Sequence, residues 1–255
     1  MYDPYPVLAS IDDHRWGILA LCGLAMLCNY VWFIAAVRQG FRDRVYPIPV
    51  FCTYFWLAGD ASMVLRYDLW FNVYDHWYLK LFWLALVFTV LCELIFLYMT
   101  LRFGREELLP SWSPMQFRAL VVAGFIAAAV TWSFVKSQLH DDLYVSYFHL
   151  ANMAGPLFAA ALLIRRRSRA GTTPLIWGAY TVMVASWFLA CALWFGTPFD
   201  SAMFVLFYAV CTVAAGAMTV AVSRLPPYSP PVAHERAGPG SEPLSAPAAP
   251  RSALS

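Results

Sequence analysis

The chain has 255 residues, of which 61% are hydrophobic and only 13% are charged, with a formal net charge of +2 and a mean hydropathy of +0.60. Soluble domains carry about 25% charged residues, so a soluble fold of this size would leave much of its apolar surface in water. The composition therefore excludes an ordinary soluble domain and indicates that lipid is the solvent.

Seven apolar runs follow one another along the chain, and a membrane-spanning helix needs about 20 such residues. They cover residues 16–37, 48–65, 81–101, 119–135, 143–164, 174–195 and 202–222. The second and fourth are short, so six spans are the alternative count. Near-continuous hydrophobicity, rather than alternation in ten-residue segments, favours helices over an outer-membrane barrel. We therefore expect an all-α membrane protein, a seven-transmembrane helical bundle.

Basic residues alternate between the loops as the positive-inside rule requires. With the N-terminus outside and the C-terminus cytoplasmic, the cytoplasmic segments receive eleven arginines and the outer segments four basic residues. The cytoplasmic set is Arg38, Arg42, Arg44, Arg102, Arg105, Arg118, Arg165, Arg166, Arg167, Arg169 and Arg224, and the outer set is Arg15, Arg66, Lys80 and Lys136. The localisation we expect is an integral, multi-pass protein of a bacterial plasma membrane or a eukaryotic endomembrane.

The composition changes sharply after Arg224. Residues 225–255 are rich in Pro, Ala, Ser and Gly and cannot bury enough surface to fold. We expect two parts: residues 1–224 as the transmembrane domain and residues 225–255 as a disordered cytoplasmic tail.

Aromatic and acidic residues mark the predicted outer boundary. We expect an interfacial belt of Trp70, Trp77, Tyr78, Tyr144, Tyr147 and Trp194. Asp141 and Asp142 are adjacent in a short outer loop and are interpreted as a solvated turn.

Two carboxyl side chains lie within the apolar runs. Of the fifteen acidic residues, thirteen fall in loops or tails, whereas Asp60 and Glu93 fall inside the second and third runs. A charge at the centre of a spanning helix costs about 2.5 to 3.5 kcal/mol even on a lenient scale, so each acid indicates a functional site. A carboxyl buried in hydrocarbon tends to remain protonated and is then a potential Brønsted acid.

His149 is the third candidate for the catalytic site. Counting the helical rise of 1.5 Å per residue puts His149 and Asp60 at similar depths, with Asn152 one turn deeper, while Asp60 and Glu93 are on adjacent helices but not level. An Asp and a His at one level could share a proton. The alternative is that all three are ordinary packing or interfacial residues.

Other chemistries lack the residues that they need. The last apolar run has no lysine for a retinal Schiff base, and the chain has neither an HExxH motif nor a DDxxD-type cluster for magnesium and a diphosphate. All six cysteines lie in predicted helices without a CxxC motif or a nearby histidine cluster. We therefore expect no metal site and no cofactor.

Four stretches give the chain a family resemblance. They are the sequence NYVWFIAAVRQGFRDRVYPIPV, the Ile48-Pro49 pair where the family has Met-Pro, the segment RFGREELLP, and the turn RRRSRAGTT. With them the chain resembles the small seven-helix membrane-bound terpene cyclases of meroterpenoid and indole-terpenoid biosynthesis. These enzymes cyclise polyprenyl or epoxy-polyprenyl chains by protonation rather than by loss of diphosphate.

The resemblance implies a role for Asp60. Counted from Pro49, the family's catalytic Glu, which follows a Trp, falls on Asp60, although here the pair is Gly59-Asp60. The family's second carboxylate, an Asp in the seventh helix, falls near residues 211–216, where this chain has no acid. Glu93 replaces it from another helix, or one acid suffices, or the protein has diverged from that reaction.

The mechanism that the resemblance implies is protonation of an epoxide or olefin by Asp60, with Glu93 or His149 as the base that removes the final proton. Aromatic faces stabilise carbocations, and the predicted substrate-lining residues are Trp56, Trp83, Tyr98, Asn152, Tyr180 and Trp187. The expected partners are a hydrophobic isoprenoid substrate and membrane lipid, with no nucleic acid. The alternative function is a proton-coupled small-molecule or lipid carrier or receptor in which Asp60 is the carrier acid.

Overall fold

The computed structural model describes residues 2–228, and within that range every regular element is a helix. The predicted tail, apart from its first four residues, lies outside the described residues. In chain order the helices are α1 (Pro4–Asp13), α2 (Arg15–Asp43), α3 (Val50–Val64), the π-helix η1 (Leu69–Val73), α4 (Trp77–Phe103), α5 (Arg105–Leu108), α6 (Pro114–Leu139), α7 (Val145–Arg166), α8 (Pro174–Trp194) and α9 (Ala202–Arg224).

Six of the described helices are long and apolar enough to cross a membrane, namely α2, α4, α6, α7, α8 and α9. The helical class and the multi-pass architecture are thus as the sequence predicts. The remaining apolar run forms α3, which has 15 residues and is shorter than a bilayer core requires. The count of seven spans depends on α3 and stays a prediction, as does the side of the membrane that each terminus faces.

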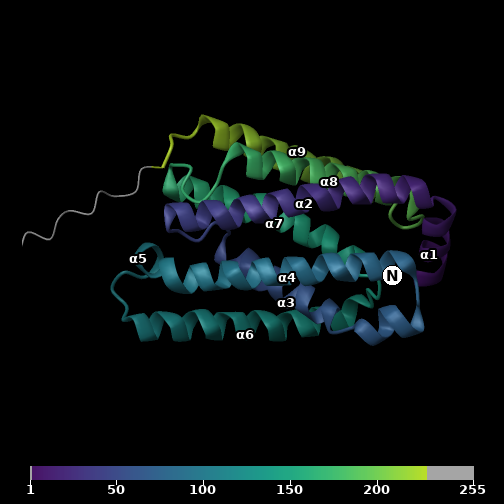
Figure 1. Cartoon of the computed structure of the whole chain (residues 1–255), viewed down its shortest axis with the longest axis horizontal. Coiled ribbons are helices and arrows are strands. Elements are labelled where there is room, and N and C mark those ends of the chain that lie inside the picture. Colours follow the sequence, from purple (N-terminus) through teal and green to yellow (C-terminus); the bar gives the residue numbers. More distant parts are fainter. Residues whose placement is uncertain (1, 229–255) are drawn as a thin grey trace, which may run out of the picture.

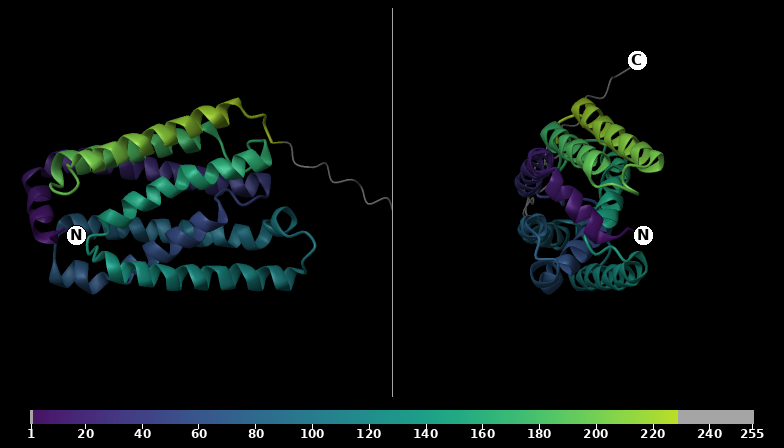
Figure 2. Two further views of the ribbon diagram at one scale, coloured as in Figure 1. Left: turned by 180° about the vertical axis from the view of Figure 1, so that it is seen from behind. Right: turned by 90° about the vertical axis from the view of Figure 1, so that its right-hand side faces the viewer.

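The long helices form two groups joined by α7 (Figure 1). Helix α2 packs on α8, which packs on α9, while α3 packs on α4 and α6; α7 contacts both α9 and α3. Figure 2 shows α3 crossing the bundle obliquely. Helix α3, which carries Asp60, therefore lies in the interior of the bundle between α4, α6 and α7.

Arginines gather at the end of the bundle that carries α5. Arg44, Arg102, Arg105 and Arg118 line one pocket there, and a second one includes Arg165. We call this the Arg-rich end. Arginines of three predicted cytoplasmic loops thus meet at one end of the bundle.

Helix α1 lies across the opposite end and was not expected from the sequence (Figure 1). Asp3 caps it by accepting a hydrogen bond from the Tyr5 N–H at 3.0 Å, and Val7, Leu8 and Ile11 are buried against the bundle. With ten residues, it is too short for hydropathy to distinguish it from a loop.

Two expectations about that end are wrong. Four of the six residues assigned to an interfacial belt are buried in the protein instead: Trp70, Tyr78, Tyr144 and Tyr147. Asp141 is also buried, and its carboxylate accepts hydrogen bonds from the Tyr2 hydroxyl at 2.5 Å and the Tyr147 N–H at 2.8 Å. Burial raises the pKa of Asp141 above its ordinary value. The acidic pair therefore organises the start of α7 rather than forming a solvated turn.

Candidate active site

Asp60 and Glu93 line one cavity in the interior of the bundle. Asp60 is 6% exposed and Glu93 is 1% exposed, and the cavity that they share has a volume of about 40 Å³. Its walls come from five helices and are formed by Asn29, Trp32, Phe33, Trp56, Asp60, Thr89, Glu93, Phe148, Ala151, Asn152, Tyr180 and Met183.

Two hydroxyl groups hold the Asp60 carboxyl. Thr89 Oγ1 on α4 donates to Asp60 Oδ2 at 2.7 Å, and the Tyr144 hydroxyl donates to Asp60 Oδ1. Tyr144 precedes α7 and has a left-handed backbone with φ of 68°, a conformation that a bulky residue adopts only when its surroundings enforce it. The buried Asp141 turn supplies that enforcement, because the Tyr144 N–H donates to the Asp141 carbonyl at 3.3 Å.

Gly59 makes room for this arrangement. A Cβ at position 59 would lie 2.1 Å from the Tyr147 hydroxyl, whose own hydrogen bond goes to the Phe55 carbonyl at 2.6 Å. The Tyr147 side chain comes from α7 and occupies the space beside Gly59, so no larger residue fits at position 59.

Glu93 lies one helical turn after Thr89 on the same face of α4. Its Oε2 atom has no hydrogen-bond partner among the described residues. No basic side chain lines the cavity in the described part of the chain. Burying an unpaired carboxylate costs several kcal/mol or more, and two neighbouring carboxylates cost more still. At least one of the two acids in the cavity therefore carries a proton.

Backbone carbonyls of α7 accept hydrogen bonds from the aromatic walls, and a proline leaves one of these carbonyls free. Pro156 has no N–H to donate to the carbonyl of Asn152, four residues earlier, and the Tyr180 hydroxyl donates to that carbonyl at 2.7 Å. Trp56 Nε1 donates to the Ala151 carbonyl at 3.1 Å. Gly155 permits the approach, since a Cβ there would lie 2.5 Å from the Tyr180 hydroxyl.

The rings of Trp56 and Tyr180 have their polar atoms engaged, whereas Trp32 Nε1 has no hydrogen-bond partner among the described residues. The Trp32 ring centroid lies 5.6 Å from that of Trp56 and 5.5 Å from that of Tyr180. Aromatic quadrupoles at such a site stabilise a cation by roughly 0.5 to 2 kcal/mol each without forming a bond to it. The cavity therefore combines carboxylic acids with a lining suited to positive charge.

The structure brings together five of the residues predicted for the site: Asp60, Glu93, Trp56, Asn152 and Tyr180. Tyr98 lies elsewhere, because it is 52% exposed on the outer face of α4. Trp83 Nε1 donates to the Val64 carbonyl at 2.9 Å at the end of α3. Trp187 lies beside the cavity, in the wall of a neighbouring groove.

The predicted pairing of Asp60 with His149 is wrong. The His149 ring stacks on Phe188 with centroids 5.1 Å apart and on Phe199 at 5.6 Å, facing α8 and the loop after it. Depth along a helix does not determine which way a side chain points, and His149 lies roughly 200° around α7 from Ala151 in the cavity wall. Asp60 meets the face of α4 that carries Glu93 instead.

Thr89, Tyr144, Trp32, Phe33 and Phe148 belong to the site and were not predicted from the sequence. Thr89 is four residues before Glu93, which a helical-wheel comparison could have detected. The sequence predicts an interfacial position for Tyr144 because it lies at the outer end of the apolar run 143–164, and no local signal shows that its hydroxyl reaches α3.

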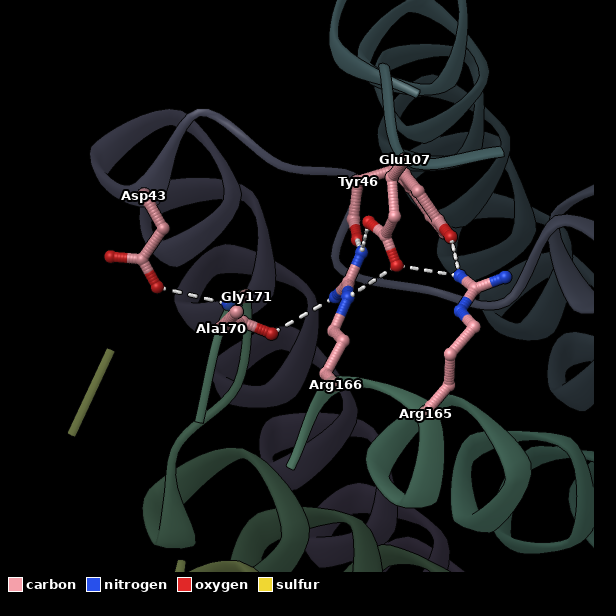
Figure 3. Close-up of polar contacts among 7 residues, drawn as sticks. All are labelled: Asp43, Tyr46, Glu107, Arg165, Arg166, Ala170 and Gly171. Carbon is pink, nitrogen blue, oxygen red and sulfur yellow. Dashed lines mark hydrogen bonds and ion pairs between the residues drawn. The ribbon is translucent and has the colours of Figure 1, made fainter. Parts of the chain in front are cut away.

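A second polar cluster lies at the Arg-rich end (Figure 3). Glu107 on α5 accepts from Arg166 Nη2 at 2.7 Å and Nε at 3.0 Å, and from Arg165 Nη2 at 2.6 Å. Arg166 also donates to the carbonyls of Tyr46, at 3.0 Å, and Ala170, at 2.9 Å, and the Tyr46 hydroxyl contacts Arg165. We call Tyr46, Glu107, Arg165 and Arg166 the ionic clamp.

The clamp is assembled from the stretches that carry the family resemblance. Tyr46 comes from the first stretch, Glu107 from RFGREELLP, and both arginines from RRRSRAGTT. In the same turn, Gly171 has a φ of 74° and its N–H donates to Asp43 at 2.9 Å. Burial by itself raises the pKa of Glu107, but the hydrogen bonds and charges of Arg166 and Arg165 outweigh it and hold that pKa below the ordinary value.

Within residues 2–228, no group of three or more His, Cys, Asp or Glu side chains could hold a metal ion. No family model matches the chain, and no solved structure matches it. The chain is similar to the Pyr4-family terpene cyclase mfmH of Annulohypoxylon moriforme, with 24% identity over 204 residues that cover 75% of this chain and 70% of the relative. The resemblance to membrane-bound terpene cyclases that the motifs suggest is thereby confirmed.

Proposed function

We propose that this protein is an integral-membrane terpene cyclase in which Asp60 protonates an isoprenoid substrate. The observation that carries the proposal is the cavity itself: two buried carboxyls, no cation among the described lining residues, and walls that include several aromatic rings. The similarity to a Pyr4-family terpene cyclase supports this chemistry and does not favour a carrier.

The proposed reaction is an isomerisation. The Asp60 carboxylic acid transfers its proton to an epoxide oxygen or to the terminal alkene carbon of a polyprenyl chain. The C–O bond opens, or the alkene becomes a tertiary cation, and the next double bond attacks that cation to close a ring. A base then removes a proton from a neighbouring carbon to form an alkene, so the mass of the substrate is unchanged.

Thr89 and Tyr144 are positioning residues for the acid. Both donate to Asp60, so they fix the carboxyl in one orientation and stabilise the carboxylate that forms after proton transfer. Glu93 is the base in this proposal, because its unpartnered oxygen lies in the same cavity. His149 faces α8 and does not line the cavity, so it has no role in this proton transfer.

The substrate must displace side chains to bind. Ligand pockets have volumes of roughly 300–1,000 Å³, whereas the cavity between the acids has about 40 Å³. Several aromatic rings form its walls, and rotation of such rings is the simplest way to admit a prenyl chain. The proposed enzyme therefore closes around its substrate and excludes water, which would otherwise capture the cation.

The test is to incubate membranes that contain the protein with prenylated substrates, epoxidised and unepoxidised, and to analyse the products by mass spectrometry. A cyclase produces a new isomer of unchanged mass, and membranes with the Asp60→Asn variant at equal expression do not. A carrier only redistributes the substrate. Absence of any isomer from a broad set of prenylated substrates, or full activity of Asp60→Asn, would overturn the proposal.

A further inference from the structure

A groove lies beside the cavity on the surface of the bundle. Helices α2 and α4 form its two banks and α8 contributes to its floor; its volume is about 410 Å³, which is ten times that of the cavity. Leu27, Leu81 and Leu84 on its banks are exposed, and they belong to helices of membrane-spanning length. The groove is therefore open to the acyl chains of the bilayer.

A wall of three aromatic rings separates the groove from the cavity. Phe82 and Trp187 line the groove, and Phe148 lines the cavity. Their ring centroids lie 4.9 Å apart for Phe148 and Trp187 and 5.8 Å apart for Phe82 and Phe148. The two spaces also meet along α2, where Asn29 in the cavity contacts the sulfur of Met26 in the groove at 3.9 Å. Rotation of a few side chains would join them.

Two residues of the groove wall, Tyr78 and Trp187, carry hydrogen-bond donors without a partner among the described residues. The Tyr78 hydroxyl and Trp187 Nε1 are buried, with their residues 5% and 3% exposed, and neither atom has a hydrogen-bond partner in the described part of the chain. A buried polar group left unpaired costs about 1–3 kcal/mol. Both residues line the same apolar groove, so an acceptor atom of a ligand bound between them is the partner that we infer for these two donors.

We propose that this groove is a substrate subsite that binds the unreactive, oxygen-bearing portion of the isoprenoid substrate, with Tyr78 and Trp187 as its hydrogen-bond donors. The substrate reaches it laterally from the bilayer, and its prenyl chain passes the wall at Phe148 into the cavity. This inference rests on the proposed cyclase function, because it concerns the part of the same substrate that does not react.

The lining selects the chemistry of the ligand. Among the described residues no charged side chain lines the groove, which disfavours a diphosphate or a charged lipid headgroup. A pure hydrocarbon would leave Tyr78 and Trp187 unpaired. An apolar molecule with a ketone, ether or ester oxygen satisfies both conditions.

Gly23 provides a way to fill the groove without disturbing the fold. It lies in the groove wall, and a Cβ there would meet no atom within 4 Å. The matched control is Gly178 on α8, whose Cβ would also meet nothing within 4 Å and which does not line the groove. We expect Gly23→Leu to lower kcat/KM about tenfold and Gly178→Leu to leave it within twofold.

The donors are tested separately. Tyr78→Phe and Trp187→Phe each remove one donor. Each should raise KM about fivefold, which corresponds to the loss of one hydrogen bond of about 1 kcal/mol. The effect on kcat should be smaller. Tyr208→Phe is the control, because its hydroxyl is also buried and unpartnered within the described residues but lies on α9 beside His149. A structural role alone would make Tyr78→Phe and Tyr208→Phe equivalent.

A binding measurement separates this subsite from the cyclase proposal. A diazirine derivative of farnesylacetone, a prenyl ketone, is photolysed with the full-length protein in membranes, alongside the matched hydrocarbon without oxygen. The ketone should label peptides of α2 and α4 around Gly23 and Tyr78 at least fivefold more than the hydrocarbon, in the wild type and equally in Asp60→Asn. Gly23→Leu should abolish that labelling.

The outcomes are distinct. Equal labelling by ketone and hydrocarbon, or unchanged labelling and turnover in Gly23→Leu, overturns the subsite even if the wild type produces cyclic isomers. Labelling that persists in a protein without cyclase activity overturns the proposed reaction and leaves the oxygen-selective groove in place.

Discussion

The cavity at Asp60 holds buried carboxyl groups and the ionic clamp holds the partly buried Glu107, but only the clamp supplies cations to its carboxylate. Arg166 is bidentate on Glu107 and Arg165 adds a third contact, so the charge of Glu107 is neutralised where it lies. Asp60 has two hydroxyl donors, and Glu93 has an oxygen without a described partner. The charge of an ion-paired carboxylate is compensated by its partner. An unpaired carboxyl in apolar surroundings destabilises the fold, and such groups often mark functional sites.

The comparison also shows what a family resemblance measures. The stretches that resemble terpene cyclases converge on the clamp (Figure 3), where they tie the α2–α3 loop to α5 and to the end of α7. These stretches therefore supply contacts that hold the helices together, and they do not contain the two acids of the cavity. The proposed chemistry depends on Asp60 and Glu93, where this chain departs from the family pattern, so the proposed function has to be tested at the cavity.

The largest expected effect is at Asp60. Asp60→Asn keeps the hydrogen bond from Thr89 but removes the transferable proton, and we expect product formation to fall at least a hundredfold, the range of general acid catalysis. The measurement is isomer yield per amount of folded protein. Asp60→Glu is the informative companion, since it places the family's own acid at this position and should retain part of the activity.

Glu93 is expected to have the next largest effect. Glu93→Gln preserves size and removes the proposed base, and we expect turnover to fall between tenfold and a hundredfold with accumulation of products in which water has captured the cation. Product profiles from gas chromatography with mass detection measure this. An unchanged rate and profile would show that Asp60 both donates and accepts the proton.

Tyr144→Phe should have a smaller effect on turnover. It removes one of the two hydroxyl donors to Asp60 while keeping the ring that packs on Tyr147 at a centroid distance of 4.6 Å. We expect about a tenfold loss of kcat with little change in KM, because the contact positions the acid and does not bind substrate. A change confined to KM would place Tyr144 in the binding surface instead.

The clamp should affect stability and leave catalysis nearly unchanged. Arg166 is 6% exposed in its ion pair with Glu107, so Glu107→Gln leaves a buried guanidinium partly unpaired. We expect a loss of about 1–3 kcal/mol and a fall in Tm of roughly 2–4 °C per kcal/mol. The adjacent Glu106 is the matched control, because its side chain is 89% exposed and lies 4.0 Å from Arg105; Glu106→Gln should leave Tm unchanged.

Acidification should remove the contribution of the clamp. The pKa of Glu107 is lowered in the folded protein, so its stabilisation is fully present above the ordinary Glu pKa of about 4.3 and is lost as the pH falls through the lowered folded value. The Tm difference between wild type and Glu107→Gln should therefore be largest near neutral pH and shrink toward pH 3. A difference that persists at that pH would show that the charge of Glu107 is not what stabilises the clamp.

The sequence predicts the helical bundle well because hydrophobic runs and arginine placement are local signals. It also identifies both cavity acids, since Asp60 and Glu93 stand out against apolar neighbours. It misses the direction in which side chains point. His149 was paired with Asp60 by depth alone, and Tyr144 was assigned to the interface, whereas rotation around α7 and the buried turn at Asp141 decide their actual places.

The most direct test compares Asp60→Asn with Glu107→Gln in one experiment that measures isomer yield and Tm for both variants. Our account predicts that Asp60→Asn loses at least a hundredfold in yield with a Tm near that of the wild type. It predicts that Glu107→Gln keeps its yield within about threefold at a permissive temperature while its Tm falls. The opposite pattern, an active Asp60→Asn or a stable but inactive Glu107→Gln, would contradict the assignment of chemistry to the cavity and stability to the clamp.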